Sequence, residues 1–158
     1  LSPDGASAGK VKFGDGVFYD VHQKNNKVYA GAPTVSEAVP KFAGIVVREA
    51  GIASGYPAIN DEVADFQKGL IAKEGYIEYK EAYVVTTTSH TELGTKKSVF
   101  DNVDLSYVLM ASASNGSIYF AQTSSDKVSS SDVLVGKIVS MNPDDKTVTV
   151  YISPAIYA

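Results

Sequence analysis

The sequence predicts an all-β protein, a small β-barrel or β-sandwich with little helix. Short runs of β-branched and aromatic residues alternate with Gly, Pro, Asn and Asp, which favour turns. No stretch carries a long helical period, and many short strands with frequent turn signals are typical of barrels and sandwiches. The 158 residues are enough to bury one core without disulfides or a metal, and there is no Cys.

The chain is expected to form one domain preceded by an arm. Residues 1–10 are rich in Ser, Pro, Gly and Ala, which predicts a flexible, extended N-terminal arm. Residues 11–158 are expected to form a single β-rich domain, with an elaborated insertion at about 86–132.

The first third of the domain contains three predicted elements. Residues 10–29 indicate a hairpin whose turn is at Lys24–Lys27, and 34–39 allows at most one helical turn before Pro40. Residues 42–48 are almost continuously apolar and predict a buried strand. Gly44 inside it indicates a bulge, a tight bend or a close approach of backbone.

Residues 61–75 fit two structures. Val63, Phe66, Leu70 and Ile71 are spaced as on one face of a helix, whereas Gly69 disfavours a helix by about 1 kcal/mol relative to Ala. Lys68-Gly69 also suits a turn between two short strands. The pattern alone does not choose between helix and strands.

The rest of the domain is predicted to be strands. Residues 75–80 alternate and 82–88 continue with strong β formers, while 99–110 and 117–121 predict a hairpin with Asn115-Gly116 at its tip. The polar segment 122–132 is expected to be an exposed loop. The last predicted hairpin pairs 136–141 with 147–152, and Val148, Val150 and Ile152 should face the core while Thr147, Thr149 and Tyr151 face outward.

Composition and motifs argue against catalysis, cofactors and nucleic acid. The net charge is −4, and Arg48 alone among 14 cationic residues is an Arg, whereas nucleic-acid binding proteins rely on clustered Lys and Arg. His22 and His90 stand far apart without carboxylates at ligand spacing, and no nucleophile elbow, phosphate loop or zinc motif is present. No run of about 18 apolar residues predicts a membrane span.

Tyrosine is the abundant residue that suits binding. Ten Tyr residues are present, and Tyr is enriched at protein interfaces because its ring contributes area and its hydroxyl a hydrogen bond. Tyr76 and Tyr79 fall on opposite faces of one predicted strand, so at least one should lie away from the core. That residue is a candidate contact residue.

Several segments resemble the cement or decoration proteins of tailed-bacteriophage capsids. They are Phe42–Arg48, Gly55-Tyr56-Pro57, Asn60–Val63, Lys68–Ile71 and Tyr76-Ile77. Gly136–Val139 and the terminal hairpin are similar to the closing strands of that family, whereas 86–132 has no counterpart. The resemblance favours strands over a helix in 61–75.

This resemblance implies a β-tulip-like barrel that forms a homodimer or homotrimer and binds the major capsid protein. The protein would then be a non-enzymatic structural component on the outer capsid surface of a virion assembled in the host cytoplasm, without cofactors. The expected contact residues are Leu1, Ser2, Pro3, Arg48, Tyr56, Tyr76, Tyr79 and Tyr151. An alternative is a carbohydrate-binding or adhesin-type β-barrel that stacks sugars on exposed Tyr rings, and a weaker one is a hydrolase with carboxylates that converge only in the fold.

Overall fold

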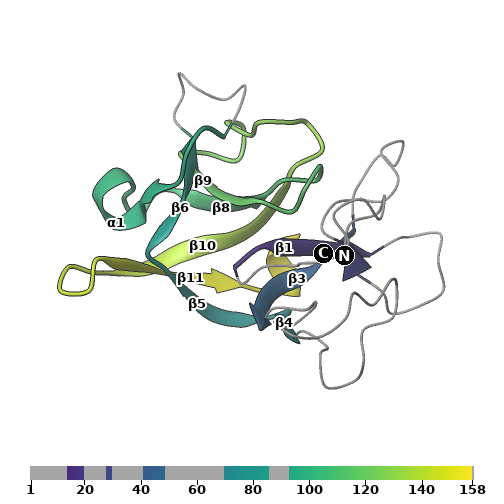
Figure 1. Cartoon of the computed structure of the whole chain (residues 1–158), viewed down its shortest axis with the longest axis horizontal. Helices are drawn as coiled ribbons and strands as arrows, with labels where there is room; N and C mark the ends of the chain where they lie inside the picture. The colour runs from purple at the N-terminus through teal and green to yellow at the C-terminus, as the bar shows by residue number, and fades with distance from the viewer. Residues whose placement is uncertain (1–13, 20–27, 30–40, 49–69, 86–92, 158) are drawn as a thin grey trace, which may run out of the picture.

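The computed structural model describes residues 14–19, 28–29, 41–48, 70–85 and 93–157. Their regular structure is almost entirely strand, arranged in one sheet of seven strands and one of four (Figure 1). The two helices in these residues, α1 (Val99–Asn102) and α2 (Pro154–Tyr157), have four residues each. The predicted all-β class is therefore confirmed.

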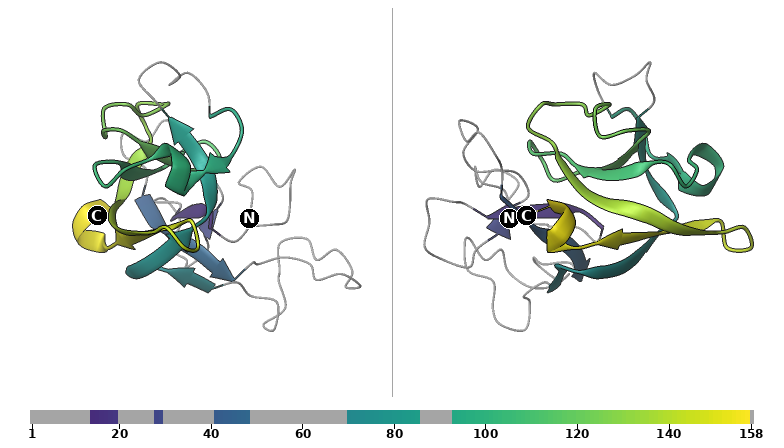
Figure 2. Two further views of the ribbon diagram at one scale, coloured as in Figure 1. Left: turned by 90° about the vertical axis from the view of Figure 1, so that its left-hand side faces the viewer. Right: turned by 180° about the vertical axis from the view of Figure 1, so that it is seen from behind.

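The larger sheet is curled like part of a barrel. Its strand order is β5-β11-β10-β8-β9-β6-β7. The strands are β5 (Gly75–Tyr79), β6 (Glu81–Val85), β7 (Lys97–Ser98), β8 (Val108–Ala111), β9 (Ile118–Ala121), β10 (Val133–Asn142) and β11 (Thr147–Ile152). Only Lys80 separates β5 from β6 in the sequence. In the sheet, however, β5 is the strand at one end, and β6 lies next to β7, the strand at the other end. The sheet must therefore bend back on itself (Figure 2).

The β10–β11 hairpin follows the predicted alternation. Val148, Val150 and Ile152 are fully buried, whereas Thr147, Thr149 and Tyr151 are partly exposed. β10 pairs with β11 from Gly136↔Ile152 to Asn142↔Thr147, with a bulge between Ile138 and Ser140. The predicted hairpin and its two faces are confirmed.

The smaller sheet has the order β2-β1-β3-β4 and lies at one end of the curled sheet (Figure 1). It contains β1 (Gly16–Tyr19), β2 (Val28–Tyr29), β3 (Lys41–Arg48) and β4 (Leu70–Ala72). The antiparallel pairing of β1 with β2 confirms the first predicted hairpin, while its turn and the segment 34–39 lie outside the described residues. β4 is a strand, so the helical alternative is wrong for Leu70–Ala72; residues 61–69 lie outside the described part.

Both sheets contribute to one hydrophobic core. Phe18, Phe42 and Ile45 from the smaller sheet pack with the inward residues of the larger one, including Phe120 and Val150. The Phe42 ring centroid lies 4.8 Å from that of Tyr157 in α2 (Pro154–Tyr157), edge to face. The Tyr157 hydroxyl donates a hydrogen bond to the carbonyl of Lys73. This ties α2 to the turn between β4 and β5.

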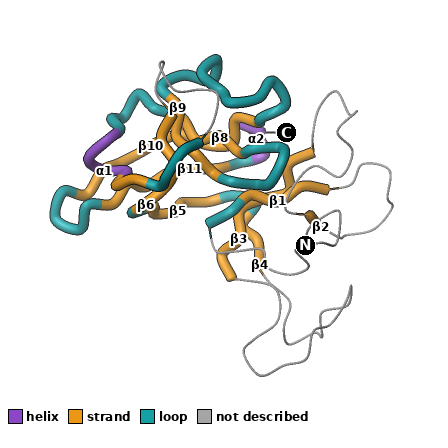
Figure 3. The backbone as a smooth tube through the Cα atoms, turned by 45° about the horizontal axis from the view of Figure 1, so that its top comes forward, coloured by secondary structure: helices purple, strands orange, loops and turns teal. Residues whose placement is uncertain are grey.

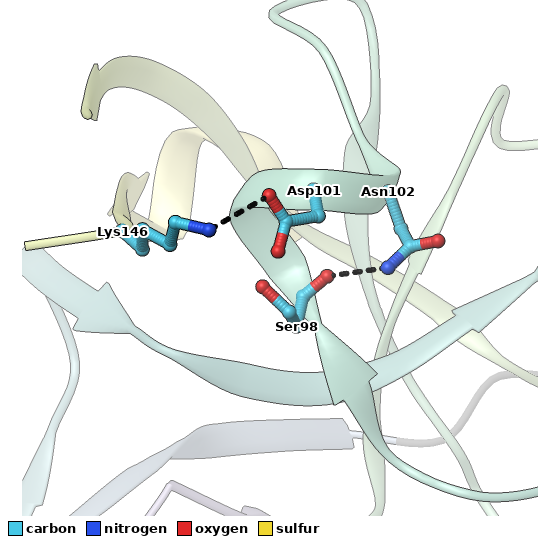
Figure 4. A network of polar contacts seen from close by, with 4 residues as sticks. All are labelled: Ser98, Asp101, Asn102 and Lys146. Carbon is cyan, nitrogen blue, oxygen red and sulfur yellow. Dashed lines mark hydrogen bonds and ion pairs between the residues drawn. The ribbon is translucent and has the colours of Figure 1, made fainter.

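The predicted strand 99–110 is correct only at its end, Val108–Met110. Val99–Asn102 form the short helix α1, and strand β8 begins at Val108 (Figure 3). In α1 the side-chain amide of Asn102 donates to the carbonyl of Ser98 at 2.7 Å, and Asp101 lies 3.6 Å from the ammonium of Lys146 on the β10–β11 turn (Figure 4). The hairpin β8–β9 itself is confirmed.

The described part of 86–132 belongs to the barrel rather than forming an insertion on it. β8 and β9 stand inside the seven-stranded sheet, and β9 pairs in parallel with β6. Segment 122–132 is exposed over most of its length, as predicted, but Asp132 is buried and Val128 packs on a second cluster that contains Val85 and Tyr119. The loop therefore covers the outer side of β6, β8 and β9.

Candidate interaction surface

The outward side of β5, β11 and β10 carries an exposed pair of tyrosines. Tyr76 on β5 pairs in register with Tyr151 on β11, and their ring centroids are 5.2 Å apart at an interplanar angle of 47°. Tyr76 is 71% exposed, the most exposed large hydrophobic side chain among the described residues. The Tyr151 hydroxyl donates to Oε1 of Glu74 at 3.1 Å, which holds the second ring in place.

Polar and aliphatic side chains surround this pair. On β5, Glu78 is exposed and pairs with Thr149. On β10, exposed Lys137 pairs with Tyr151, and Val139 in the bulge is 47% exposed. We call this surface the tyrosine face and define it by Tyr76, Glu78, Lys137, Val139, Thr149 and Tyr151. Its β5 side is acidic, and its β10 side is basic and aliphatic.

Two of the predicted contact residues lie on this face and one does not. Tyr76 and Tyr151 come together as described, whereas Tyr79 is 7% exposed and its hydroxyl donates to the carbonyl of Gly14 at 2.9 Å. Tyr79 points inward because it is three residues from Tyr76 on a strand of period two. It therefore belongs to the core, and its predicted place on a contact surface is wrong.

Of the remaining predicted contact residues, only Arg48 lies in the described part of the chain. Arg48 ends β3, where its backbone pairs with Leu70. Leu1, Ser2, Pro3 and Tyr56 lie outside the described residues.

Burial raises the pKa of three tyrosine hydroxyls in the described part, and the effect is large for Tyr79 and Tyr119. Burial raises the pKa of the Tyr79 hydroxyl above its ordinary value near 10, and the charge of Asp15 raises it further. Burial also raises the pKa of Tyr119, with a second contribution from its hydrogen bond to Asp132. Both hydroxyls therefore stay neutral in the folded protein at pH values where an unfolded chain has begun to ionise.

The protein is expected to lose stability above about pH 10. There the unfolded state binds fewer protons than the native state, so the free energy of unfolding falls as pH rises, whereas below pH 10 this contribution is fully present. Tyrosinate absorbance should show at least two hydroxyls, those of Tyr79 and Tyr119, that ionise only as the protein unfolds. If all ten tyrosines titrate together near pH 10 while the fold persists, this prediction fails.

A second concave feature lies where β5 turns into β6. A cleft of about 130 Å³ there is lined by Asp15, Glu78, Lys80, Glu81 and Lys96, with Tyr79 and Tyr83 among its walls. The ammonium of Lys96 lies 5.7 Å from the centroid of the Tyr83 ring. Its charges are mixed, and nothing in the cleft selects a class of ligand.

The described residues contain neither a metal cluster nor a membrane-spanning helix. Among them, no group of three or more His, Asp or Glu side chains is arranged to hold a metal ion, and no helix is long and apolar enough to cross a membrane. His22 and His90 lie outside the described part. The chain matches no family model, no curated protein and no solved structure.

Four members of the tyrosine face were not among the predicted contact residues: Glu78, Lys137, Val139 and Thr149. The alternation of the terminal hairpin places Lys137 outward, so that signal was available. Val139 was not predictable, because a bulge in β10 exposes it. Glu74 joins Tyr151 across 77 residues of sequence, and no local pattern predicts such a contact.

Proposed function

We propose that the chain is a non-enzymatic structural protein of a tailed-phage virion that binds the outside of the major capsid lattice and stabilises the head. The observation that carries the proposal is the exposed tyrosine pair, Tyr76 with Tyr151, on the outward side of the curled seven-stranded sheet. Burying such rings between subunits contributes strongly to affinity, and Tyr is a frequent anchor at the centre of interfaces.

Two further features support this role. One segment that resembles the capsid cement proteins, Phe42–Arg48, lies in strand β3, and the similar terminal segment forms the hairpin β10–β11. A barrel in which strands far apart in sequence share one core resists deformation, as a clamp between capsomers requires.

Binding to particles tests the proposal. Purified chain added to phage heads that lack it should saturate at a copy number set by the capsid lattice, measured by co-sedimentation and quantitative mass spectrometry. Tyr76→Ala should weaken occupancy about tenfold or more, because it removes the exposed ring. Leu105→Ala is the matched control, since Leu105 is 61% exposed but lies outside the tyrosine face.

Two outcomes contradict the proposal. One is the absence of saturable binding to any head particle of a phage that encodes the chain. The other is binding of oligosaccharides by the isolated chain, lost in Tyr76→Ala, which would instead support the carbohydrate-binding alternative.

A further inference from the structure

We propose that Tyr157 and Glu74 are positioning residues of the tyrosine face, and that they connect this face to α2 through the β4–β5 turn. Neither residue is among the predicted contact residues. The proposal deepens the proposed function and rests on it for its biological meaning, because it concerns the same surface. Its first test uses the isolated chain, without particles.

The turn between β4 and β5 consists of Lys73 and Glu74, and both residues are exposed. Within the described part of the chain, no strand pairing includes either of them. The pairing of β4 with β3 ends at Ala72, and the pairing of β5 with β11 begins at Gly75. The position of the turn between these two ladders therefore depends on the side chains that bind it.

Tyr157 holds the first residue of this turn from the side of the core. Its hydroxyl donates a hydrogen bond to the carbonyl of Lys73, and its ring packs edge to face on Phe42, with 4.8 Å between the ring centroids. Burial raises the pKa of this hydroxyl, and the charges of Tyr19 and Glu74 raise it further, as expected for a partly buried group near both. The ammonium of Lys73 also lies 5.7 Å from the centroid of the Tyr19 ring on β1. The turn is thus fixed to α2 and to the smaller sheet.

Glu74 transfers this order to the tyrosine face. Its Oε1 accepts the hydrogen bond of the Tyr151 hydroxyl at 3.1 Å, and the Tyr151 ring lies 5.2 Å from that of Tyr76 between centroids. Within the described residues, the Tyr76 side chain has no hydrogen bond, and its ring contact is with Tyr151. A shift of the turn moves the acceptor away from Tyr151. Because an oriented ring loses less conformational freedom on binding than a free one, this order contributes to affinity for a partner.

Tyr157→Phe separates positioning from packing. It removes the hydrogen bond to Lys73 but keeps the ring that packs on Phe42. The freed carbonyl lies in an exposed turn, where water can bind it. The fold should therefore persist, while the turn moves more freely and the rings of the tyrosine face lose their fixed geometry.

NMR spectroscopy of the isolated full-length chain, isotope-labelled in its tyrosine rings, measures this effect. In Tyr157→Phe the signals of Tyr76 and Tyr151 should shift most of the way toward those of an unstructured tyrosine, whereas the signals of Tyr119, in a separate buried cluster, should stay in place. Tyr107→Phe is the matched control. Tyr107 is also partly buried against the main core, but its hydroxyl makes no hydrogen bond within the described part of the chain.

A truncating and a conservative variant test Glu74. Glu74→Ala removes the acceptor of the Tyr151 hydroxyl and should disturb both rings as Tyr157→Phe does. Glu74→Gln keeps an acceptor oxygen and should preserve the native signals. On phage heads, Tyr157→Phe and Glu74→Ala should each raise the dissociation constant about threefold, whereas Glu74→Gln should leave it within about twofold of native.

Three results overturn the proposal. The Tyr76 and Tyr151 signals could keep their native positions in Tyr157→Phe or in Glu74→Ala. Glu74→Gln could disturb the rings as much as Glu74→Ala, which would assign the effect to the charge and not to the acceptor. Tyr157→Phe could fail to fold, measured by circular dichroism, and its hydroxyl would then support the fold rather than the face. Rings that respond as expected in a chain that binds no phage head would support the positioning role and contradict the proposed function alone.

Discussion

Asp132→Ala is expected to lower the free energy of unfolding by about 3 kcal/mol or more. The buried carboxylate accepts hydrogen bonds from the amide of Ala113 at 3.1 Å, the hydroxyl of Tyr119 at 2.6 Å and the amide of Ser129 at 3.1 Å. The Tyr119 hydroxyl in turn accepts from the amide of Val128 at 3.1 Å. Removing the carboxylate leaves three donors without this acceptor in a buried site, and each costs its desolvation.

Urea unfolding of matched variants measures this effect. Asp126→Ala is the control, because Asp126 lies on the same loop and accepts hydrogen bonds from Thr123, but in an exposed position. Asp126→Ala should lower the free energy of unfolding by less than about 1 kcal/mol. The loss of unfolding free energy in Asp132→Asn should fall between those of the two Ala variants. The amide keeps one acceptor oxygen but turns the other into a donor that faces the amide of Ser129. Equal losses for Asp132→Ala and Asp126→Ala would contradict the account.

The Asp132 network also shows why sequence reasoning predicted this region only in part. Segment 122–132 is polar and rich in Ser, and most of it is exposed as expected. Its last residue is buried because an acceptor is needed by Tyr119, 13 residues away, and by Ala113, 19 residues away. Nothing in the local pattern distinguishes Asp132 from the exposed polar residues before it.

The error at 99–107 has a local cause. Val99 and Phe100 read as the start of a strand, but polar side chains here bond to nearby backbone and favour turns. Asp104 accepts from the amide of Ser106 at 2.9 Å and from its hydroxyl, and these bonds lower the pKa of Asp104. Together with the helix α1, this turn redirects the chain before β8 begins at Val108.

The strands themselves were predictable wherever side chains alternate or run continuously apolar. β3 and β11 coincide with the predicted segments to within one residue at each end. The strand period predicted that Tyr76 or Tyr79 faces outward, but not that it is Tyr76. The curled sheet was less predictable in its pairings, because β6 meets β9 in parallel across more than 30 residues. The tyrosine face depends on such pairing, since Tyr76 and Tyr151 are neighbours only through the register of β5 with β11.

Gly44→Ala is expected to destabilise the protein by about 3 kcal/mol or more. Gly44 has φ +151°, a backbone conformation that residues with a side chain rarely adopt, and a Cβ there would lie 2.6 Å from the carbonyl oxygen of Ala72. β1 pairs through Val17↔Gly44 and Phe18↔Phe42, so the extra residue Ala43 forms a bulge next to this glycine. The predicted bulge and close backbone approach are thus both present, and a methyl group would push β4 away from β3.

Gly75→Ala separates the two causes of that loss. Gly75 has a similar φ of +133°, but nothing lies within 4 Å of a Cβ placed there. Gly75→Ala should therefore lower the free energy of unfolding only by the backbone strain, about 1 to 2 kcal/mol. The difference between the variants, measured by urea unfolding, gives the cost of the clash between a Cβ at position 44 and the carbonyl of Ala72. If the two substitutions cost the same, the contact of Gly44 with Ala72 does not limit which residue this position accepts, and strain alone explains the glycine.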